Sequence, residues 1–178
     1  RARLQVRYHH LQSFINMSLG TGEESLPLLE PTEHALALAR MQSNHMEVAY
    51  SLFVLGRLEM DCRQFERAAK HTAESLKLWR QEGLAFGISS AAEMLAFQLG
   101  YTGHFTNPDG QVGDLLNESL HWARITENRM KIATSLNKVA WLTFYVEGNV
   151  DEAVTLWNEN LAITDEISYV EMSGRTQF

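Results

Sequence analysis

Three similar five-residue segments recur along the chain: Glu-Ser-Leu-Lys-Leu at 74–78, Glu-Ser-Leu-His-Trp at 118–122 and Glu-Asn-Leu-Ala-Ile at 159–163. They begin 44 and 41 residues apart, and a looser copy, His-Ala-Leu-Ala-Leu, occupies 34–38, 40 residues before the first. A repeat of this length is typical of solenoids built from helical hairpins. The chain is therefore predicted to be a repeat array.

A second landmark gives the same period. In each repeat a helix-like stretch is followed by a short polar turn and then by an apolar residue that opens a second helix, with the turns centred on 63, 103 and 148. Gly103 and Gly148 can take the left-handed conformation that ends a helix. Asn149 or Asp151 can then start the next one. The long stretches without proline also favour helices, because an internal proline costs about 3 kcal/mol.

These signals predict an all-α protein, a right-handed α-solenoid in a single domain. We expect about four antiparallel hairpins, because each has an apolar face that it cannot bury alone and must stack on its neighbours. The expected helices lie roughly at 3–18, 31–43, 46–61, 65–82, 86–102, 112–127, 130–147 and 150–166, which gives hairpins at 3–43, 46–83, 86–127 and 130–166. The segment 19–30 is predicted as a loop, and 168–178 as the start of a further, truncated repeat.

The repeats match the spacing of a known motif, in which Leu-Gly, an aromatic residue, Gly-x-aromatic, Ala and Ala-Leu recur. The first set comprises Leu52, Leu55, Gly56, Phe65, Ala68, Ser75 and Leu76. The second comprises Ala92, Leu95, Ala96, Leu99, Gly103, Phe105, Ser119 and Leu120. The third comprises Ala140, Phe144, Gly148, Val150, Ala153, Asn160 and Leu161.

In these positions the chain resembles the tetratricopeptide (TPR) repeat. Arg63 replaces the turn glycine of the first set, Asn160 replaces a small residue in the third, and the period exceeds the usual length of about 34 residues. The longer period is similar to that of the TPR regions of bacterial regulators of the maltose-activator type and related nucleotide-switch ATPases. The resemblance implies a binding or sensing module in a signalling or transcription-regulating protein.

Composition excludes several classes of function. A net charge of -7 and scattered basic residues argue against direct nucleic-acid binding. The single cysteine, Cys62, forms no disulfide within one chain and fits a cytoplasmic protein. The apolar stretch 84–101 contains Glu93 and is predicted as a buried helix, so no membrane association is expected. The chain begins without an initiator methionine, and we expect a piece of a longer protein.

No pattern of catalytic residues or metal ligands occurs. The seven histidines form no His-x-x-x-His pair, and no Cys-x-x-Cys or Gly-x-Ser-x-Gly motif is present. Arg63 beside Cys62 could lower the pKa of the thiol, but no base accompanies it, so a passive thiol is the preferred interpretation. We therefore expect neither an enzyme nor a cofactor or metal site.

The resemblance implies that the first helix of each hairpin lines an inner, concave groove. Aromatic residues interleaved with charged ones are typical of interface anchors. The motif register places the partner-binding residues at Tyr50, Phe53, Arg57, Glu93, Phe97, Tyr101, Lys138 and Tyr145, with Met60 and Leu142 in the same register. The alternative interpretation is that Phe53 and Phe97 belong to the core. The four tryptophans are expected to pack between hairpins, and a ligand-stacking role for one of them is the alternative interpretation. They are Trp79, Trp122, Trp141 and Trp157.

Two hypotheses on function remain open. The groove can hold a segment of a partner protein or of another domain of the parent chain. Alternatively, the superhelix can enclose a small effector and control an attached ATPase or DNA-binding domain. Exposed end faces at 1–18 or 168–178 add the hypothesis of a homo-oligomer that forms through the solenoid ends.

Overall fold

The computed structural model describes residues 22–103 and 111–175, and all regular structure in these ranges is helical. The predicted helix 3–18 lies outside the described residues. The seven described helices are α2 (Gly22–Met41), α3 (His45–Asp61), α4 (Phe65–Glu82), α5 (Ala85–Tyr101), α6 (Gln111–Ile125), α7 (Arg129–Tyr145) and α8 (Val150–Arg175). From α3 to α7, each begins and ends within two residues of its predicted limits.

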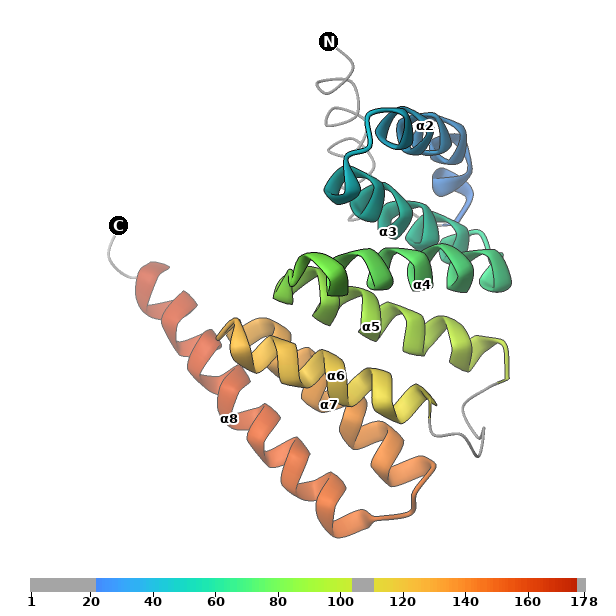
Figure 1. Cartoon of the computed structure of the whole chain (residues 1–178). Helices are drawn as coiled ribbons and strands as arrows, with labels where there is room; N and C mark the ends of the chain where they lie inside the picture. Colours follow the sequence, from blue (N-terminus) through green and yellow to red (C-terminus); the bar gives the residue numbers. More distant parts are fainter. Residues whose placement is uncertain (1–21, 104–110, 176–178) are drawn as a thin grey trace.

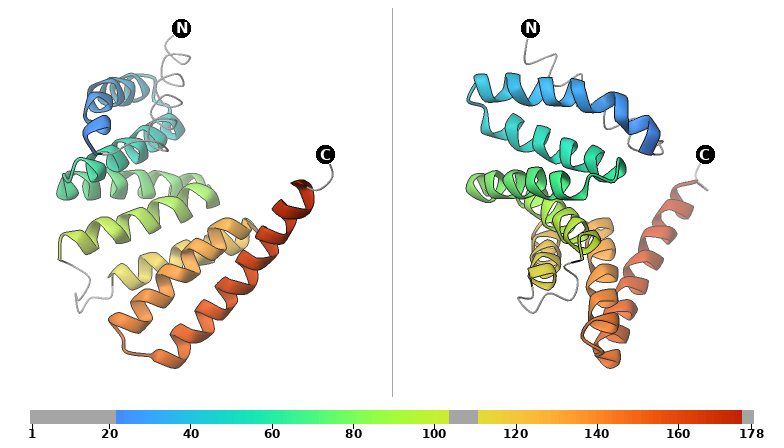
Figure 2. Two further views of the ribbon diagram at one scale, coloured as in Figure 1. Left: turned by 180° about the vertical axis from the view of Figure 1, so that it is seen from behind. Right: turned by 90° about the vertical axis from the view of Figure 1, so that its right-hand side faces the viewer.

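The helices stack in the order of the chain. Each one packs against the next, with α2 at one end of the stack and α8 at the other (Figure 1). The two further views show the same progression and show that α8 extends along one side at its end of the stack (Figure 2). This arrangement of antiparallel neighbours is an α-solenoid, as predicted.

The turns follow the local chemistry of the sequence. Gly103 and Gly148 have φ angles of 88° and 70°, the left-handed conformation expected of them. Arg63, which stands where the motif has a glycine, also adopts a positive φ of 61°. The start of α8 is set by Asn149, whose Oδ1 accepts a hydrogen bond from the backbone N–H of Glu152 at 3.3 Å.

The predicted loop at 19–30 is wrong over residues 22–30, because α2 already begins at Gly22 and runs through Pro27 and Pro31. Each proline removes one backbone donor from the helix. Packing outweighs this cost, because Leu29 and Leu36 pack with the buried face of α3 in one apolar cluster. Tertiary contacts therefore override local propensity at this end.

The other end also differs from the prediction. Residues 168–175 continue α8 without a turn, so no separate element begins at residue 168. The stretch 164–172 contains neither glycine nor proline, and nothing in it interrupts the helical hydrogen bonds.

The core is continuous along the stack. One cluster of buried apolar residues extends from α3 to α8, and a smaller one joins α2 to α3. Small polar residues allow the helices to approach closely within it: the Ser75 hydroxyl donates to the Ala49 carbonyl at 2.6 Å, and the Ser119 and Ser135 hydroxyls lie 3.1 Å apart. Among the described helices, none is both long and apolar enough to cross a membrane.

Candidate functional site

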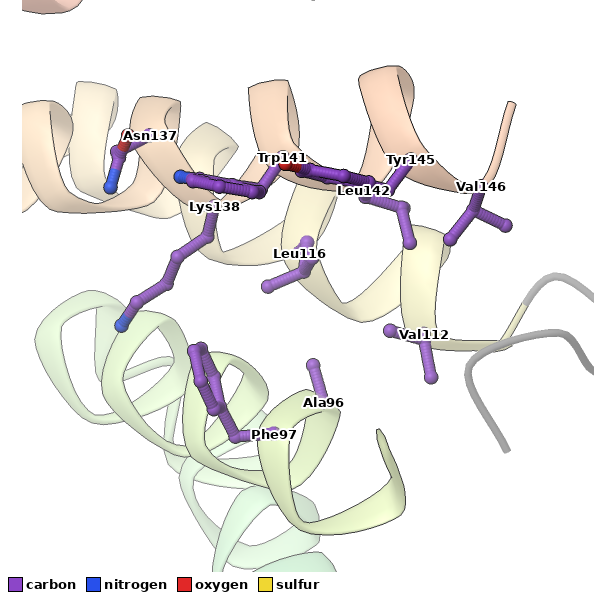
Figure 3. Close-up of a pocket in the computed structure, with 10 residues that line it drawn as sticks. All are labelled: Ala96, Phe97, Val112, Leu116, Asn137, Lys138, Trp141, Leu142, Tyr145 and Val146. Carbon is purple, nitrogen blue, oxygen red and sulfur yellow. The ribbon is translucent and has the colours of Figure 1, made fainter. Parts of the chain in front are cut away.

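A groove opens between α5 and α7, and α6 forms its floor (Figure 3). Its cavity volume is about 620 Å³, within the range of roughly 300–1,000 Å³ that ligand pockets have. Most of its lining is apolar. The lining residues are Ala96, Phe97, Val112, Leu116, Asn137, Lys138, Trp141, Leu142, Tyr145 and Val146.

The helical register explains why one face of α7 lines the groove. Lys138, Trp141 and Tyr145 lie three and four residues apart, so their side chains emerge on the same side of the helix. The side chain of Phe97 approaches from α5 on the opposite wall (Figure 3). Because α5 and α7 are the first helices of consecutive hairpins, the stacking of the repeats itself creates the groove.

Three of the predicted groove residues meet here. Phe97, Lys138 and Tyr145 all line the cavity, and the Lys138 ammonium lies 4.7 Å from the centroid of the Phe97 ring. This distance fits a cation–π contact. Phe97 is half-buried and lines the groove.

Glu93, a fourth predicted residue, lies beside the groove and binds two lysines. One Glu93 carboxylate oxygen accepts a hydrogen bond from Lys131 at 2.6 Å, and the other accepts one from Lys138. All three side chains are mostly shielded from solvent. One carboxylate and two ammonium groups give this cluster a net positive charge.

The electrostatics of the cluster are coupled. Burial raises the pKa of Glu93, but the charges and hydrogen bonds of Lys131 and Lys138 outweigh burial and hold that pKa below its usual value. Burial lowers the pKa of Lys131, with Lys138 adding repulsion, while Glu93 opposes the change. The excess positive charge is therefore held in a partly desolvated position at the edge of an apolar cavity.

The other four predicted residues do not line this cavity. Phe53 packs on Trp79, with ring centroids 5.2 Å apart, and half-buried Tyr50 packs against the core. The Nε of Arg57 lies 3.4 Å from Asp61, one helical turn away. Tyr101 stacks on Phe65 at 4.8 Å. Their part in binding a partner stays a prediction.

Trp141 is the groove residue that sequence reasoning assigned to another role. It was expected to pack between hairpins, yet 48% of it is exposed. Its ring stacks on Tyr145 with centroids 4.6 Å apart and meets Trp157 edge-on at 6.1 Å. Its position between Lys138 and Tyr145 in the helical register was the signal that pointed to the groove.

Cys62 offers no activated nucleophile. Burial raises the pKa of its thiol, and the carboxylates of Asp61 and Glu59 raise it further. Arg63 does not produce the lowering that its place in the sequence suggested. Among the side chains that the structure describes, no three from His, Cys, Asp or Glu gather closely enough to hold a metal ion.

The architecture defines the class of fold: the chain is a TPR-like α-solenoid. No protein-family model and no curated protein matches the sequence. Solved structures similar to it over 93% of its length include the nearly identical TPR-like repeats of a Podosopora anserina kinesin light chain, with 18% identity over 76% of that chain and a TM-score of 0.72.

Two further structures share the fold over the same 93% of this chain. The apo form of RapI has 11% identity and a TM-score of 0.76, and the match spans 44% of that chain. BtubC from P. vanneervenii has 15% identity and a TM-score of 0.60, with 71% of that chain covered. At these identities the likenesses show the fold alone.

Proposed function

We propose that this solenoid is a protein-interaction scaffold and that the groove between α5 and α7 holds a segment of its partner. The observation that carries the proposal is the exposed, stacked pair of Trp141 and Tyr145 beside an apolar cavity. A free surface of this kind is costly in water, and aromatic residues next to a cavity are the usual anchors of interfaces.

The polar groups of the groove support binding more than catalysis. Lys138 and Glu93 neutralise each other in part, and Asn137 Oδ1 accepts a hydrogen bond from Trp157 Nε1 at 3.2 Å. These groups orient the walls of the groove, and they form no nucleophile and base pair. The activity served by such a scaffold belongs to its partner or to an attached domain.

The test is a selection of 16-residue displayed peptides against the chain, followed by titration of an enriched peptide. Trp141→Ala is expected to lower the affinity for that peptide at least about tenfold, because an aromatic anchor contributes about 2 kcal/mol or more to binding. Phe86→Ala is the matched control: Phe86 is also an exposed aromatic residue, but it lies outside the groove. The proposal is contradicted if both variants lose the same amount of peptide affinity. It is also contradicted if the selection enriches no peptide.

A second candidate function follows from the size of the cavity. About 620 Å³ also suits a small effector, whose binding would shift the angle between the α5–α6 and α7–α8 hairpins. A thermal-shift screen against metabolites separates the two functions. A saturable shift at micromolar ligand that Trp141→Ala abolishes favours the effector, and peptide binding without such a shift favours the scaffold.

A further inference from the structure

Two polar side chains of the groove present hydrogen-bond donors. Asn137 lines the cavity, and its Oδ1 accepts a hydrogen bond from Trp157 Nε1 at 3.2 Å. Because an indole N–H can only donate, this contact sets the orientation of the amide and leaves the NH2 group of Asn137 as a donor. Lys138 lines the same cavity, and its ammonium group has three donors. The groove therefore favours an occupant that brings a hydrogen-bond acceptor.

The charge beside these donors is positive. Lys131 and Lys138 share one carboxylate, that of Glu93, and each donates one hydrogen bond to it. Among the side chains that the structure describes, no second carboxylate lies within ion-pair distance of either ammonium group. One positive charge is therefore left over at this place, although the chain as a whole has a net charge of -7.

Lys138 brings this charge to the groove. Its ammonium group lies 4.7 Å from the centroid of the Phe97 ring, which stands on the opposite wall of the cavity (Figure 3). The Lys138 side chain is 26% exposed, whereas that of Lys131 is 16% exposed. An occupant of the cavity therefore meets Lys138 first. By displacing water there, the occupant would strengthen any ion pair that it forms with this lysine.

We propose that the partner segment carries a carboxylate close to its apolar anchor, and that this carboxylate pairs with Lys138 and Asn137 while the anchor packs beside Trp141. This inference rests on the proposed function, because it specifies the chemistry of the segment that the groove holds. A single carboxylate matches the single excess charge of the cluster. A segment without one would cover that positive charge and leave it unpaired, which is costly.

The register of α7 sets the spacing of the two features in the partner. Lys138 and Tyr145 are seven residues apart, which corresponds to about 10 Å along the helix axis. An extended segment covers that distance with about three residues. We therefore expect the partner to carry Asp or Glu about two to four residues away from a large apolar residue.

Glu93 competes with the carboxylate of the partner. It already occupies one donor of Lys138, and its negative charge repels a second carboxylate at the same ammonium group. Glu93 is absent from the lining of the cavity, so it does not contact the apolar anchor. Its charge therefore limits the affinity for an acidic segment, and removing that charge should have the opposite effect to removing the charge of Lys138.

The test compares an enriched 16-residue peptide with twin peptides in which each Asp or Glu in turn is replaced by its amide. Isothermal titration calorimetry measures the affinity of every peptide for the whole chain. One twin is expected to bind about fivefold more weakly than its parent. Added salt should narrow that difference, because it screens the ion pair. The inference is overturned if the enriched peptides have no acidic residue or if every twin binds as tightly as its parent. The proposed function still holds in either case, provided that Trp141→Ala lowers the affinity.

Two variants of the chain locate the pairing. In Lys138→Gln protein the parent peptide and its weaker twin are expected to bind equally, because the carboxylate has lost its partner. In Glu93→Gln protein the difference between them is expected to grow by about threefold, because the competing charge is gone. The matched control is Lys77→Gln, which removes an exposed lysine outside the groove and should leave the difference unchanged.

Both peptides are compared on the same protein, so a loss of stability in a variant affects them equally. A difference that persists undiminished in Lys138→Gln protein overturns the pairing with Lys138. A difference that Glu93→Gln leaves unchanged or reduces overturns the competing role of Glu93.

Discussion

Glu59 is a carboxylate with no exposed surface, held between α3 and α4. His71 Nδ1 lies 2.7 Å from one of its oxygens, and Arg67 Nε lies 3.1 Å from the other. Arg67 also reaches Glu33 of α2 at 3.1 Å. A buried charge is tolerated only with such partners, so these residues tie the first three described helices together.

His71→Ala is expected to lower the free energy of unfolding by about 2 kcal/mol. Removing a hydrogen-bond partner from a buried polar group usually costs about 1–3 kcal/mol, and Arg67 stays beside the other Glu59 oxygen. Urea unfolding followed by circular dichroism measures the change. His121→Ala, at an exposed position on α6, should cost less than about 0.5 kcal/mol. Equal effects in the two variants would show that Glu59 does not depend on His71.

The pH dependence of stability should report on Glu93. Its pKa in the folded chain lies below the usual value, so its contribution is present above the unfolded pKa of about 4.3 and is lost as the pH falls through the folded pKa. The free energy of unfolding in urea should therefore be higher for the wild type than for Glu93→Gln, and the difference should be largest near pH 7. The difference should shrink steadily below about pH 4. A difference that is constant from pH 7 to pH 3 contradicts this assignment.

At the scale of helices, glycines set how closely two elements approach. A Cβ added at Gly87 of α5 would lie 2.4 Å from the Trp79 ring of α4, and one at Gly56 of α3 would lie 2.3 Å from Thr72 Oγ1. A Cβ at Gly113 of α6 meets one methyl group of Leu142, at 3.3 Å. Packing therefore leaves no room for an alanine at Gly87 or Gly56. At Gly113 a small movement of the Leu142 side chain would make room for one.

Gly87→Ala is expected to destabilise the chain by about 1–3 kcal/mol, because overpacking outweighs the gain in helix propensity. Gly113→Ala tests the opposite case and should be neutral or gain up to about 1 kcal/mol. Thermal unfolding of both variants gives the comparison. A stabilised Gly87→Ala variant would mean that α4 and α5 are not packed as closely as described.

The sequence predicted the helices wherever local chemistry and repeat spacing agreed. Gly103 and Gly148 show why, since their left-handed turns are a property of the residue itself. The start of α2 was missed because Pro27 and Pro31 oppose a helix locally, and packing on α3 decides the outcome. In the groove, the register of the repeat motif correctly placed Phe97 and Lys138 at the cavity. The exposure of Trp141 could not be predicted in this way, because it depends on tertiary packing.

At the scale of the whole molecule, stability should follow position in the stack. Helix α4 packs between α3 and α5, whereas α8, the last of the described helices, packs on α7 alone among them and exposes Val154 and Leu161. In a solenoid each unit is held by its nearest neighbours. We therefore expect an end helix to open more readily than a central one.

Amide hydrogen exchange, read by mass spectrometry in dilute protein, tests this expectation. Backbone amides of α8 should be protected at least about tenfold less than those of α4, because local opening at an end breaks fewer contacts. Uniform protection from α3 to α8 would indicate a single cooperative unit.

Binding of the partner in the groove between α5 and α7 can be followed through the indole N–H signals of the four tryptophans. Each signal is assigned by substitution, and an enriched peptide is titrated into nitrogen-15-labelled protein. If the groove binds the peptide, the Trp141 signal shifts saturably while that of buried Trp79 stays in place. Saturable binding that moves Trp79 or Trp122 and leaves Trp141 unchanged would contradict it.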